Sequence, residues 1–283
     1  MVREVFEKKV IFGESVRGAS HRHSGTECQD SHGCGHFKGG GGDSYILAVA
    51  DGHGSDACPY SKDGSSIAAA TFVKIMEEYC KSYDGDFDSL LTFLNRDGGT
   101  KVAQTIEAEW KKRVLKTHAD NMRNSAAAES EIYRQYGSTL VGLMITPGFI
   151  FALQIGDGDA VLIDGAGIAP VISSDKILGI ETHSLSAPNA WKKAISITER
   201  RDAEEREENP YVFMLSTDGF ANSFASDGEY KKSCMGYYDM IKEHGPLEVA
   251  ENLKKWLSET SEMGCGDDIS VLFFADIVQP ESP

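Results

Sequence analysis

Two spacings of apolar residues alternate along this chain of 283 residues. Short β-branched and aromatic runs, bounded by glycine or aspartate, predict strands. Longer stretches repeat apolar residues at helical spacing, as Ala68, Phe72, Ile75 and Met76 do, and predict amphipathic helices. The predicted strands cover residues 9–18, 44–50, 138–146, 149–155, 160–164, 211–216 and 269–277, and the predicted helices cover 65–80, 100–118 and 246–258.

The connections between the central strands are too short for parallel pairing. Strands 138–146 and 149–155 are joined by Pro147-Gly148, a pair suited to a type II turn, and strand 160–164 follows after a short glycine–aspartate link. A parallel crossover needs a dozen or more residues, so we expect these three strands to form an antiparallel meander. Helices before and after a meander indicate an α+β fold built in layers.

Composition and charge limit the possible domain organisations and the possible classes of binding partner. Hydrophobic residues make up 41% of the chain and charged residues 25%, which is the balance of an ordinary globular protein. Without a convincing linker, we expect a single domain over residues 1–283 with its core in about 10–277, and surface loops at GHFKGGGGDS (35–44) and ERRDAEEREENP (199–210). The net charge of -16 disfavours nucleic acid and anionic membranes as partners. We also expect a monomer.

Apolar runs and cysteines bear on the location of the protein. The N-terminal stretch has no apolar signal-peptide core, and the longest apolar runs are shorter than the roughly 20 residues of a membrane helix. The 6 cysteines are too sparse for a disulfide framework and include no Cys-x-x-Cys pair. A zinc cluster of Cys28, His32, Cys34 and His36 would match no standard ligand spacing. We therefore expect a reducing, cytoplasmic location.

Aspartates stand repeatedly at the ends of predicted strands. Asp51, Asp157 and Asp218 each follow an apolar run and precede a glycine, whereas Asp267 lies just before the strand ISVLFF. An aspartate that ends one strand and an aspartate that starts its antiparallel neighbour lie at the same edge of a sheet, and Asp30 could join them. Carboxylates gathered at one edge repel one another unless some are protonated or a cation neutralises them.

This donor set favours a hard divalent cation. Carboxylate oxygens without histidine or thiolate ligands suit Mn²⁺ or Mg²⁺. The glycine after Asp51 lets the backbone turn sharply, which makes the Gly52 carbonyl a further candidate ligand. Two such ions can activate a water and hold a phosphoryl group, and His53 is then the natural proton donor for the departing alkoxide. Asp-Gly pairs also mark ordinary turns, but three of them with an adjacent histidine favour a metal centre.

Five motifs, in their order, resemble those of the metal-dependent protein serine/threonine phosphatases of type 2C (PPM family). They are VADGHG, YGSTL, IGDGDAVLI, LSTDGF and GDDISVLFF, and the resemblance is to a divergent, bacterial-type branch. It implies a central antiparallel β-sandwich flanked by helices on both faces. It also implies hydrolysis of phosphoserine and phosphothreonine on proteins with two or three Mn²⁺ or Mg²⁺ ions. The partners would be a phosphorylated protein substrate and a cognate Ser/Thr kinase.

The resemblance assigns roles to individual residues. His53 resembles the proposed general acid, and Asp30 the retained half of an acidic pair in which Gln29 replaces a glutamate. The residues that resemble metal ligands are Asp51, which would bridge two ions, the Gly52 carbonyl, Asp218, Asp267, and Asp157 for an additional ion.

The sequence departs from the family where the substrate phosphate is held. The family usually has an arginine shortly before the acidic pair; His21 stands at that place, and His21, Arg22 or Arg17 could serve. At the position after the last ligand, where the family has an asparagine, this chain has Asp268.

Because of these departures, one alternative function is that of a non-catalytic, phosphatase-like binding module. A second takes Asp157 as the nucleophile of an aspartyl-phosphate phosphotransferase, but that motif normally ends the first strand of a parallel sheet.

Overall fold

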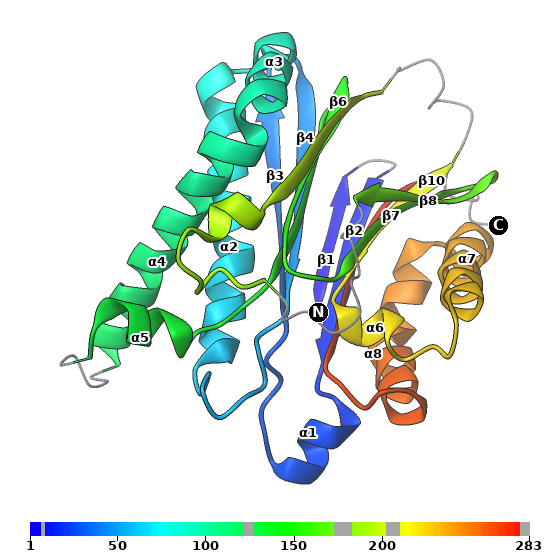
Figure 1. Ribbon diagram of the computed structural model, residues 1–283. Helices are drawn as coiled ribbons and strands as arrows, with labels where there is room; N and C mark the ends of the chain where they lie inside the picture. The colour runs from blue at the N-terminus through cyan, green and yellow to red at the C-terminus, as the bar shows by residue number, and fades with distance from the viewer. Residues whose placement is uncertain (7–8, 122–126, 173–182, 202–209, 278–283) are drawn as a thin grey trace.

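The computed structural model describes residues 1–6, 9–121, 127–172, 183–201 and 210–277 (Figure 1). The strands are β1 (Val2–Phe6), β2 (Lys9–Val16), β3 (Ser31–Gly39), β4 (Gly42–Ala50), β5 (Leu140–Ile145), β6 (Phe149–Ile155), β7 (Asp159–Asp164), β8 (Gly167–Ile172), β9 (Ile195–Arg200), β10 (Tyr211–Ser216) and β11 (Ile269–Asp276). The helices are α1 (Ala19–Ser24), α2 (Ser61–Tyr83), α3 (Phe87–Asp97), η1 (Gly98–Val102), α4 (Ala103–Asp120), α5 (Glu129–Arg134), η2 (Ala190–Lys193), α6 (Asp218–Ala221), α7 (Asp227–His244) and α8 (Pro246–Met263).

The strands form two antiparallel sheets that pack face to face. One sheet has the order β1-β2-β11-β10-β7-β8, and the other has the order β3-β4-β5-β6-β9. Apolar side chains from both inner faces, among them Leu47, Leu143, Phe213 and Phe274, are fully buried between the sheets. The removal of this apolar surface from water is the main force that holds the sandwich together.

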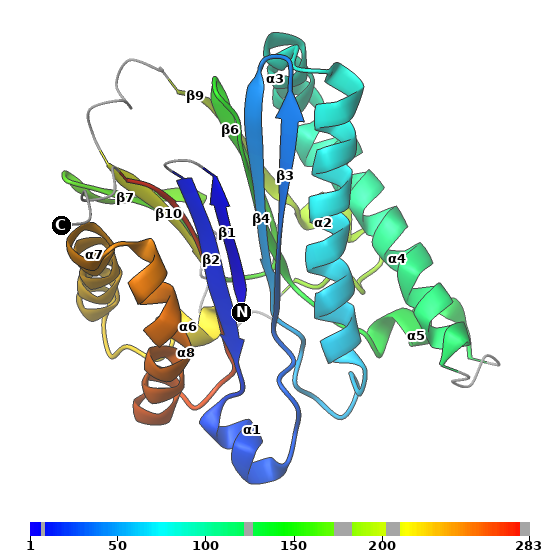
Figure 2. The same ribbon diagram turned by 180° about the vertical axis from the view of Figure 1, so that it is seen from behind.

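Helices cover the outer face of each sheet (Figures 1 and 2). On the β3-β4-β5-β6-β9 sheet, α2 and α4 bury Phe72, Met76 and Trp110. On the other sheet, α7 and α8 bury Ile241 and Leu257. Helices therefore lie outside both sheets, and the predicted α+β fold with its central antiparallel sandwich is confirmed. The three predicted helices correspond to α2, α4 and α8.

The predicted three-strand meander is wrong. β5 and β6 pair through the turn at Pro147-Gly148 as expected, but β7 pairs with β10 in the opposite sheet. Gly156 and Gly158 adopt φ values of +94° and +111°, which residues with a side chain rarely reach. These two glycines let the chain cross between the sheets, and they place Asp157 at the end of the sandwich.

The predicted loop at residues 35–44 is also wrong. Tyr45 pairs with His36 and Gly42 with Gly39, so β3 and β4 form a hairpin through this stretch. Its glycine-rich sequence hides the alternation by which strands are recognised. Residues 202–209 of the predicted loop at 199–210 lie outside the described residues, whereas 199–200 belong to β9. No helix in the described part of the chain has the length and apolar character to cross a membrane.

Candidate metal centre

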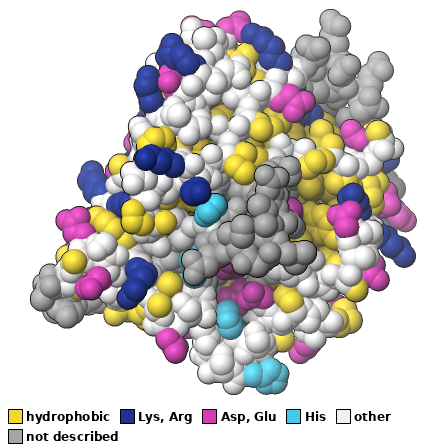
Figure 3. All heavy atoms as spheres, viewed as in Figure 1, with side chains coloured by type: hydrophobic (Ala, Val, Ile, Leu, Met, Phe, Trp, Pro, Cys, Tyr) yellow, Lys and Arg dark blue, Asp and Glu magenta, His cyan; other side chains and the backbone are white. Residues whose placement is uncertain are grey.

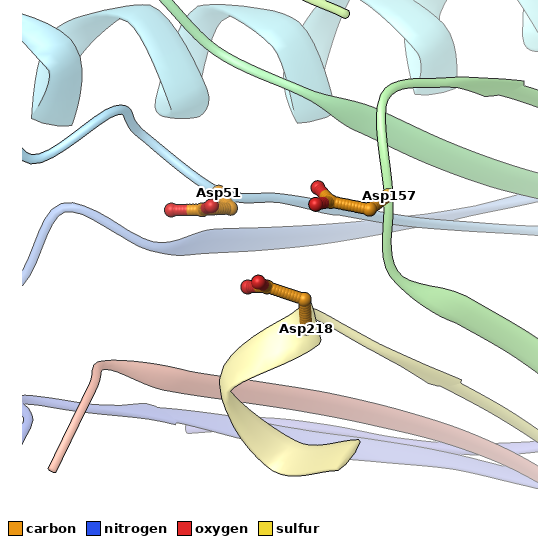
Figure 4. A group of neighbouring side chains, drawn as sticks. All are labelled: Asp51, Asp157 and Asp218. Atoms are coloured by element: carbon orange, nitrogen blue, oxygen red, sulfur yellow. The ribbon is translucent and has the colours of Figure 1, made fainter. Parts of the chain in front are cut away.

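Three carboxylates meet at one end of the sandwich, where both sheets stop. Asp51 follows β4, Asp157 lies in the crossing between β6 and β7, and Asp218 begins α6 directly after β10. One oxygen of each carboxylate lies within 4.8 Å of the other two (Figure 4). Because the three residues come from both sheets, the packing of the sandwich, and not one local loop, brings the carboxylates together.

The backbone around Asp51 is held by the start of the neighbouring strand. The Thr139 amide donates to the Asp51 carbonyl at 2.8 Å, and the Asp51 amide donates to Thr139 Oγ1 at 3.0 Å. The antiparallel bridge between Gly52 and Ser138 is formed by the Thr139–Asp51 backbone bond and by the bond from the His53 amide to the Gly137 carbonyl, and neither uses the Gly52 carbonyl. A Cβ on Gly52 would lie 2.6 Å from the Gln29 carbonyl oxygen, so the close approach of the two segments requires glycine here.

Asp30 lies beside Asp51 and is tied to the opposite sheet. It is 6% exposed and accepts a hydrogen bond from Thr217 Oγ1 at 2.6 Å. Thr217 Oγ1 in turn accepts from the Ser270 amide of β11 at 2.9 Å. Burial, and then the charge of Asp51, raises the pKa of Asp30 well above its usual range. The two carboxyls are therefore close enough to repel one another when both are ionised.

The electrostatics of Asp51 also place Asp267 at this end. Burial, followed by the charges of Asp218 and Asp267, raises the pKa of Asp51 well above its usual range, and Asp157 adds to the rise. Asp267 is therefore near Asp51, although it does not belong to the group of three. Its Oδ1 accepts from the Asp268 amide at 2.8 Å. Asp51, Asp157 and Asp218 are half-buried and offer oxygen donors only, which is a fitting site for Mn²⁺ or Mg²⁺.

His53 lies at the same end of the sandwich. Its amide donates to the Gly137 carbonyl at 3.0 Å, and a Cβ on Gly137 would lie 2.7 Å from Cδ2 of the imidazole. Burial lowers the pKa of His53, and the charge of Asp157 acts in the opposite direction. The imidazole is therefore a neighbour of the acidic group.

The three candidates for the phosphate contact differ in their partners. Arg17 Nη2 donates to the His21 carbonyl at 2.6 Å, and Arg22 Nη1 donates to the Arg17 carbonyl at 2.8 Å. Arg22 Nη2 also lies 3.4 Å from the Glu262 carboxylate. Both guanidinium groups thus bind the backbone around α1. The His21 imidazole instead faces Asp268, with Nδ1 at 2.9 Å from Oδ1.

Sequence reasoning missed three residues that hold this site in place. Thr139 fixes the Asp51 backbone and Thr217 binds Asp30, as described above. Asp268 is buried, and its carboxylate accepts from the amides of Gly18 and Gln29, both at 2.6 Å. Thr217 and Asp268 each stand next to a candidate ligand, in the motifs LSTDGF and GDDISVLFF, and a hydroxyl or carboxylate at such a place is the signal that identifies them. Thr139 lies in YGSTL, which contains no aspartate, so no such signal marks it.

Neither the zinc cluster nor the aspartyl-phosphate phosphotransferase considered from the sequence fits the structure. His32 Nδ1 lies 2.7 Å from Ser15 Oγ, and His36 Nε2 lies 3.0 Å from Asp43, so the two histidines of the considered zinc cluster have other partners. The phosphotransferase interpretation needs Asp157 at the end of a parallel strand. Asp157 instead lies where the chain crosses between two antiparallel sheets.

The comparisons with known proteins agree with this architecture. A family profile described as Protein phosphatase 2C matches residues 17–258, whereas no curated protein matches the sequence. A bacterial serine phosphatase superposes with a TM-score of 0.59 at 14% identity, over 96% of this chain and 99% of that one. The catalytic domain of the serine/threonine protein phosphatase PstP, solved with 2 manganese ions, gives 0.52 at 14% over 94% and 97%. Serine/threonine phosphatase Stp1 from Staphylococcus aureus gives 0.56 at 13% over 99% and 98%.

The fold and the acidic group define a phosphatase-like α+β sandwich with a candidate metal centre at one end. The profile match extends over far more than half of the sequence and includes Asp51, Asp157 and Asp218. The chain therefore belongs to the protein phosphatase 2C family.

Proposed function

We propose that this protein hydrolyses phosphoserine and phosphothreonine esters on proteins, with Mn²⁺ or Mg²⁺ as its cofactor. The observation that carries the proposal is the convergence of Asp51, Asp157 and Asp218 within 4.8 Å of one another, on a chain of the protein phosphatase 2C family. Mutual repulsion makes such a group unfavourable on its own, which indicates a role as a cation site.

The residues divide into ligands and supporting groups. Asp51, Asp157 and Asp218 would hold the cations, together with Asp267 and the Gly52 carbonyl. Asp30 lies against Asp51 and would act as a further ligand. When bound, divalent cations supply charge neutralisation for a phosphoryl group and a coordinated water of lowered pKa. Only oxygen donors are required for this chemistry, and the site provides them.

His53 would act on the leaving group and not on the metal. A serine or threonine alkoxide is a strong base, so it must receive a proton as the ester bond breaks. The His53 imidazole lies next to the acidic group and can donate one. The substrate would be the product of a Ser/Thr kinase, because that class of reaction forms these esters.

A phosphate-release assay on matched peptides tests the proposal. Phosphoserine, phosphothreonine and phosphotyrosine peptides of one sequence are compared with Mn²⁺, with Mg²⁺ and after addition of a chelator. We expect turnover of the first two peptides with either cation and its loss with chelator. A protein that binds Mn²⁺ but releases no phosphate from any peptide would overturn the proposal and would favour a non-catalytic binding module.

A further inference from the structure

The three carboxylates of the candidate metal centre are carried by different kinds of backbone. Asp51 is fixed by its two hydrogen bonds to Thr139, and Asp218 is the first residue of α6. Asp157 instead lies in the link Gly156–Gly158 between β6 and β7, where both glycines have positive φ (Figure 4). Because this link belongs to neither strand, sheet pairing does not fix the direction of the Asp157 side chain.

One side chain of β6 is hydrogen-bonded to both ends of this link. Gln154 Nε2 donates to the Gly158 carbonyl at 3.0 Å and to the Gly156 carbonyl at 3.3 Å. These two glycines stand immediately before and after Asp157. A single amide group therefore holds the backbone on both sides of the carboxylate.

The place of Gln154 in the core is costly for a polar residue. It alternates along β6 with Ile150 and Ala152, which belong to the apolar cluster between the sheets, and it is 1% exposed. Carbonyl oxygens only accept hydrogen bonds, so the NH₂ group must face the link. Oε1 is then left buried with no hydrogen-bond partner among the described residues. An apolar side chain would avoid this cost, so the two hydrogen bonds to the link are what the amide contributes.

The link is also closely packed against other segments. A Cβ on Gly156 would lie 2.6 Å from the His183 carbonyl oxygen, and a Cβ on Gly158 would lie 2.8 Å from the Ser216 carbonyl oxygen. These close approaches, together with the hydrogen bonds from Gln154, confine the backbone on either side of Asp157.

We propose that Gln154 is a positioning residue of the candidate metal centre, which sets the direction of the Asp157 carboxylate by holding the carbonyls on both sides of it. The inference rests on the proposed function, because it concerns the cation site used there. Asp51, Asp157 and Asp218 are half-buried, and acidic side chains lie on the surface in the lower centre of Figure 3. Gln154 is shut off from that surface, so it acts on a bound ion through the link that carries Asp157.

A double-mutant cycle tests whether Gln154 acts through Asp157. Methionine at position 154 keeps the approximate size of the side chain and removes its N–H donors. We expect Gln154→Met to weaken Mn²⁺ binding by about tenfold, the lower end of the effect of groups that orient metal ligands. In an Asp157→Ala background it should weaken Mn²⁺ binding no further, because the carboxylate that it orients is absent. Calorimetric titration of the four proteins measures both effects, and equal losses in the two backgrounds would overturn the inference.

Thr146→Val is the matched control for a general loss of stability. Thr146 is also buried, and its hydroxyl donates to the Phe149 carbonyl at 2.8 Å and accepts from the Phe149 amide at 3.0 Å, at the opposite end of the β5–β6 hairpin. Both substitutions should lower the melting temperature of the metal-free protein, but Thr146→Val should leave the Mn²⁺ affinity unchanged. If Thr146→Val weakened Mn²⁺ binding as much as Gln154→Met, the special role of Gln154 would be refuted.

A spectroscopic measurement keeps Gln154 in place and so does not depend on the folding of Gln154→Met. In ¹⁵N-labelled protein, the side-chain amide of Gln154 is assigned through its own backbone resonances. Saturating Mg²⁺ should shift this amide in the wild type and shift it far less in Asp157→Ala. Gln104, exposed on α4, is the reference whose side-chain amide should not shift. A Gln154 amide that stays unshifted in the wild type would contradict the inference.

Neither measurement depends on turnover. If Gln154 and Asp157 are coupled in Mn²⁺ binding but no peptide is dephosphorylated, the proposed function is refuted and the role of Gln154 stands. If phosphate is released but the two substitutions weaken Mn²⁺ binding independently, only the role of Gln154 is refuted.

Discussion

The two ends of the sandwich treat their acidic side chains in opposite ways. At the end away from the candidate site, Asp276 closes β11 and lies 3.7 Å from Lys9, and Asp43 near the start of β4 lies 3.0 Å from His36. At the other end of the same two strands, Asp51 has Asp218 and Asp267 as the charged neighbours that shift its pKa most. One end pairs carboxylates with basic groups, and the other gathers carboxylates together.

This difference shows that the acidic group is not a simple result of the net charge of -16. Acidic residues spread for solubility would stand apart on the surface, as Asp276 and Asp43 do. Carboxylates that share a partly buried site raise each other's pKa, and protonation or a bound cation relieves their repulsion. A cation would therefore stabilise the site end, whereas the carboxylates at the opposite end already have basic partners.

The largest expected effect is on kcat, when a negative charge is removed at the site end of β4 or β10. Asp51→Asn and Asp218→Asn should each lower kcat on a phosphoserine peptide by at least about 100-fold, the scale seen when a group that stabilises transition-state charge is lost. Asp276→Asn, at the opposite end, is the control and should keep wild-type turnover. Equal activity of Asp51→Asn and Asp276→Asn would remove the distinction between the two ends.

A second expected effect separates proton donation from metal binding. His53→Gln should slow the phosphoserine peptide by roughly 100-fold, the usual scale of general acid catalysis. It should slow nitrophenyl phosphate far less, because nitrophenolate is a weak base and needs little help as it leaves. The number of bound Mn²⁺ ions should not change. Equal slowing of both substrates with intact metal content would refute the acid role.

The smallest expected effect is the change in stability caused by Asp51→Asn. Relative to the wild type, this variant should be more stable without metal and less stable with Mn²⁺. In metal-free protein, Asp51→Asn should raise the melting temperature, because it removes repulsion among the carboxylates. Mn²⁺ at 100 times its Kd should stabilise the wild type by about 2.7 kcal/mol and stabilise Asp51→Asn much less. Thermal unfolding with and without Mn²⁺ measures both. A metal-free Asp51→Asn that melts below the wild type would argue against repulsion at this end.

Much of the fold could be predicted because most core strands are continuous apolar runs. β4, β6, β10 and β11 are apolar almost throughout, and they were found in nearly the right places. β1 and β3 were missed because charged residues and glycines interrupt them. The meander failed because a short link permits antiparallel pairing without specifying the partner, and two glycines at positive φ send the chain to the other sheet.

The candidate site was predictable to a different extent. Their places at the ends of apolar runs identify Asp51, Asp157 and Asp218 as candidates, but the packing of the two sheets is what brings the three together. Sequence alone could not show that Arg17 and Arg22 donate to backbone carbonyls whereas the His21 imidazole lies beside Asp268. Long-range contacts of this kind leave no local pattern.

The most direct test of the account is a calorimetric titration of metal-free protein with Mn²⁺. We predict that the wild type binds two or more ions and that Asp276→Asn binds the same number. Asp51→Asn should lose at least one of them, because this carboxylate lies at the centre of the group. Absence of Mn²⁺ binding by the wild type, or identical binding by Asp51→Asn, would contradict the assignment of the acidic group as a metal centre.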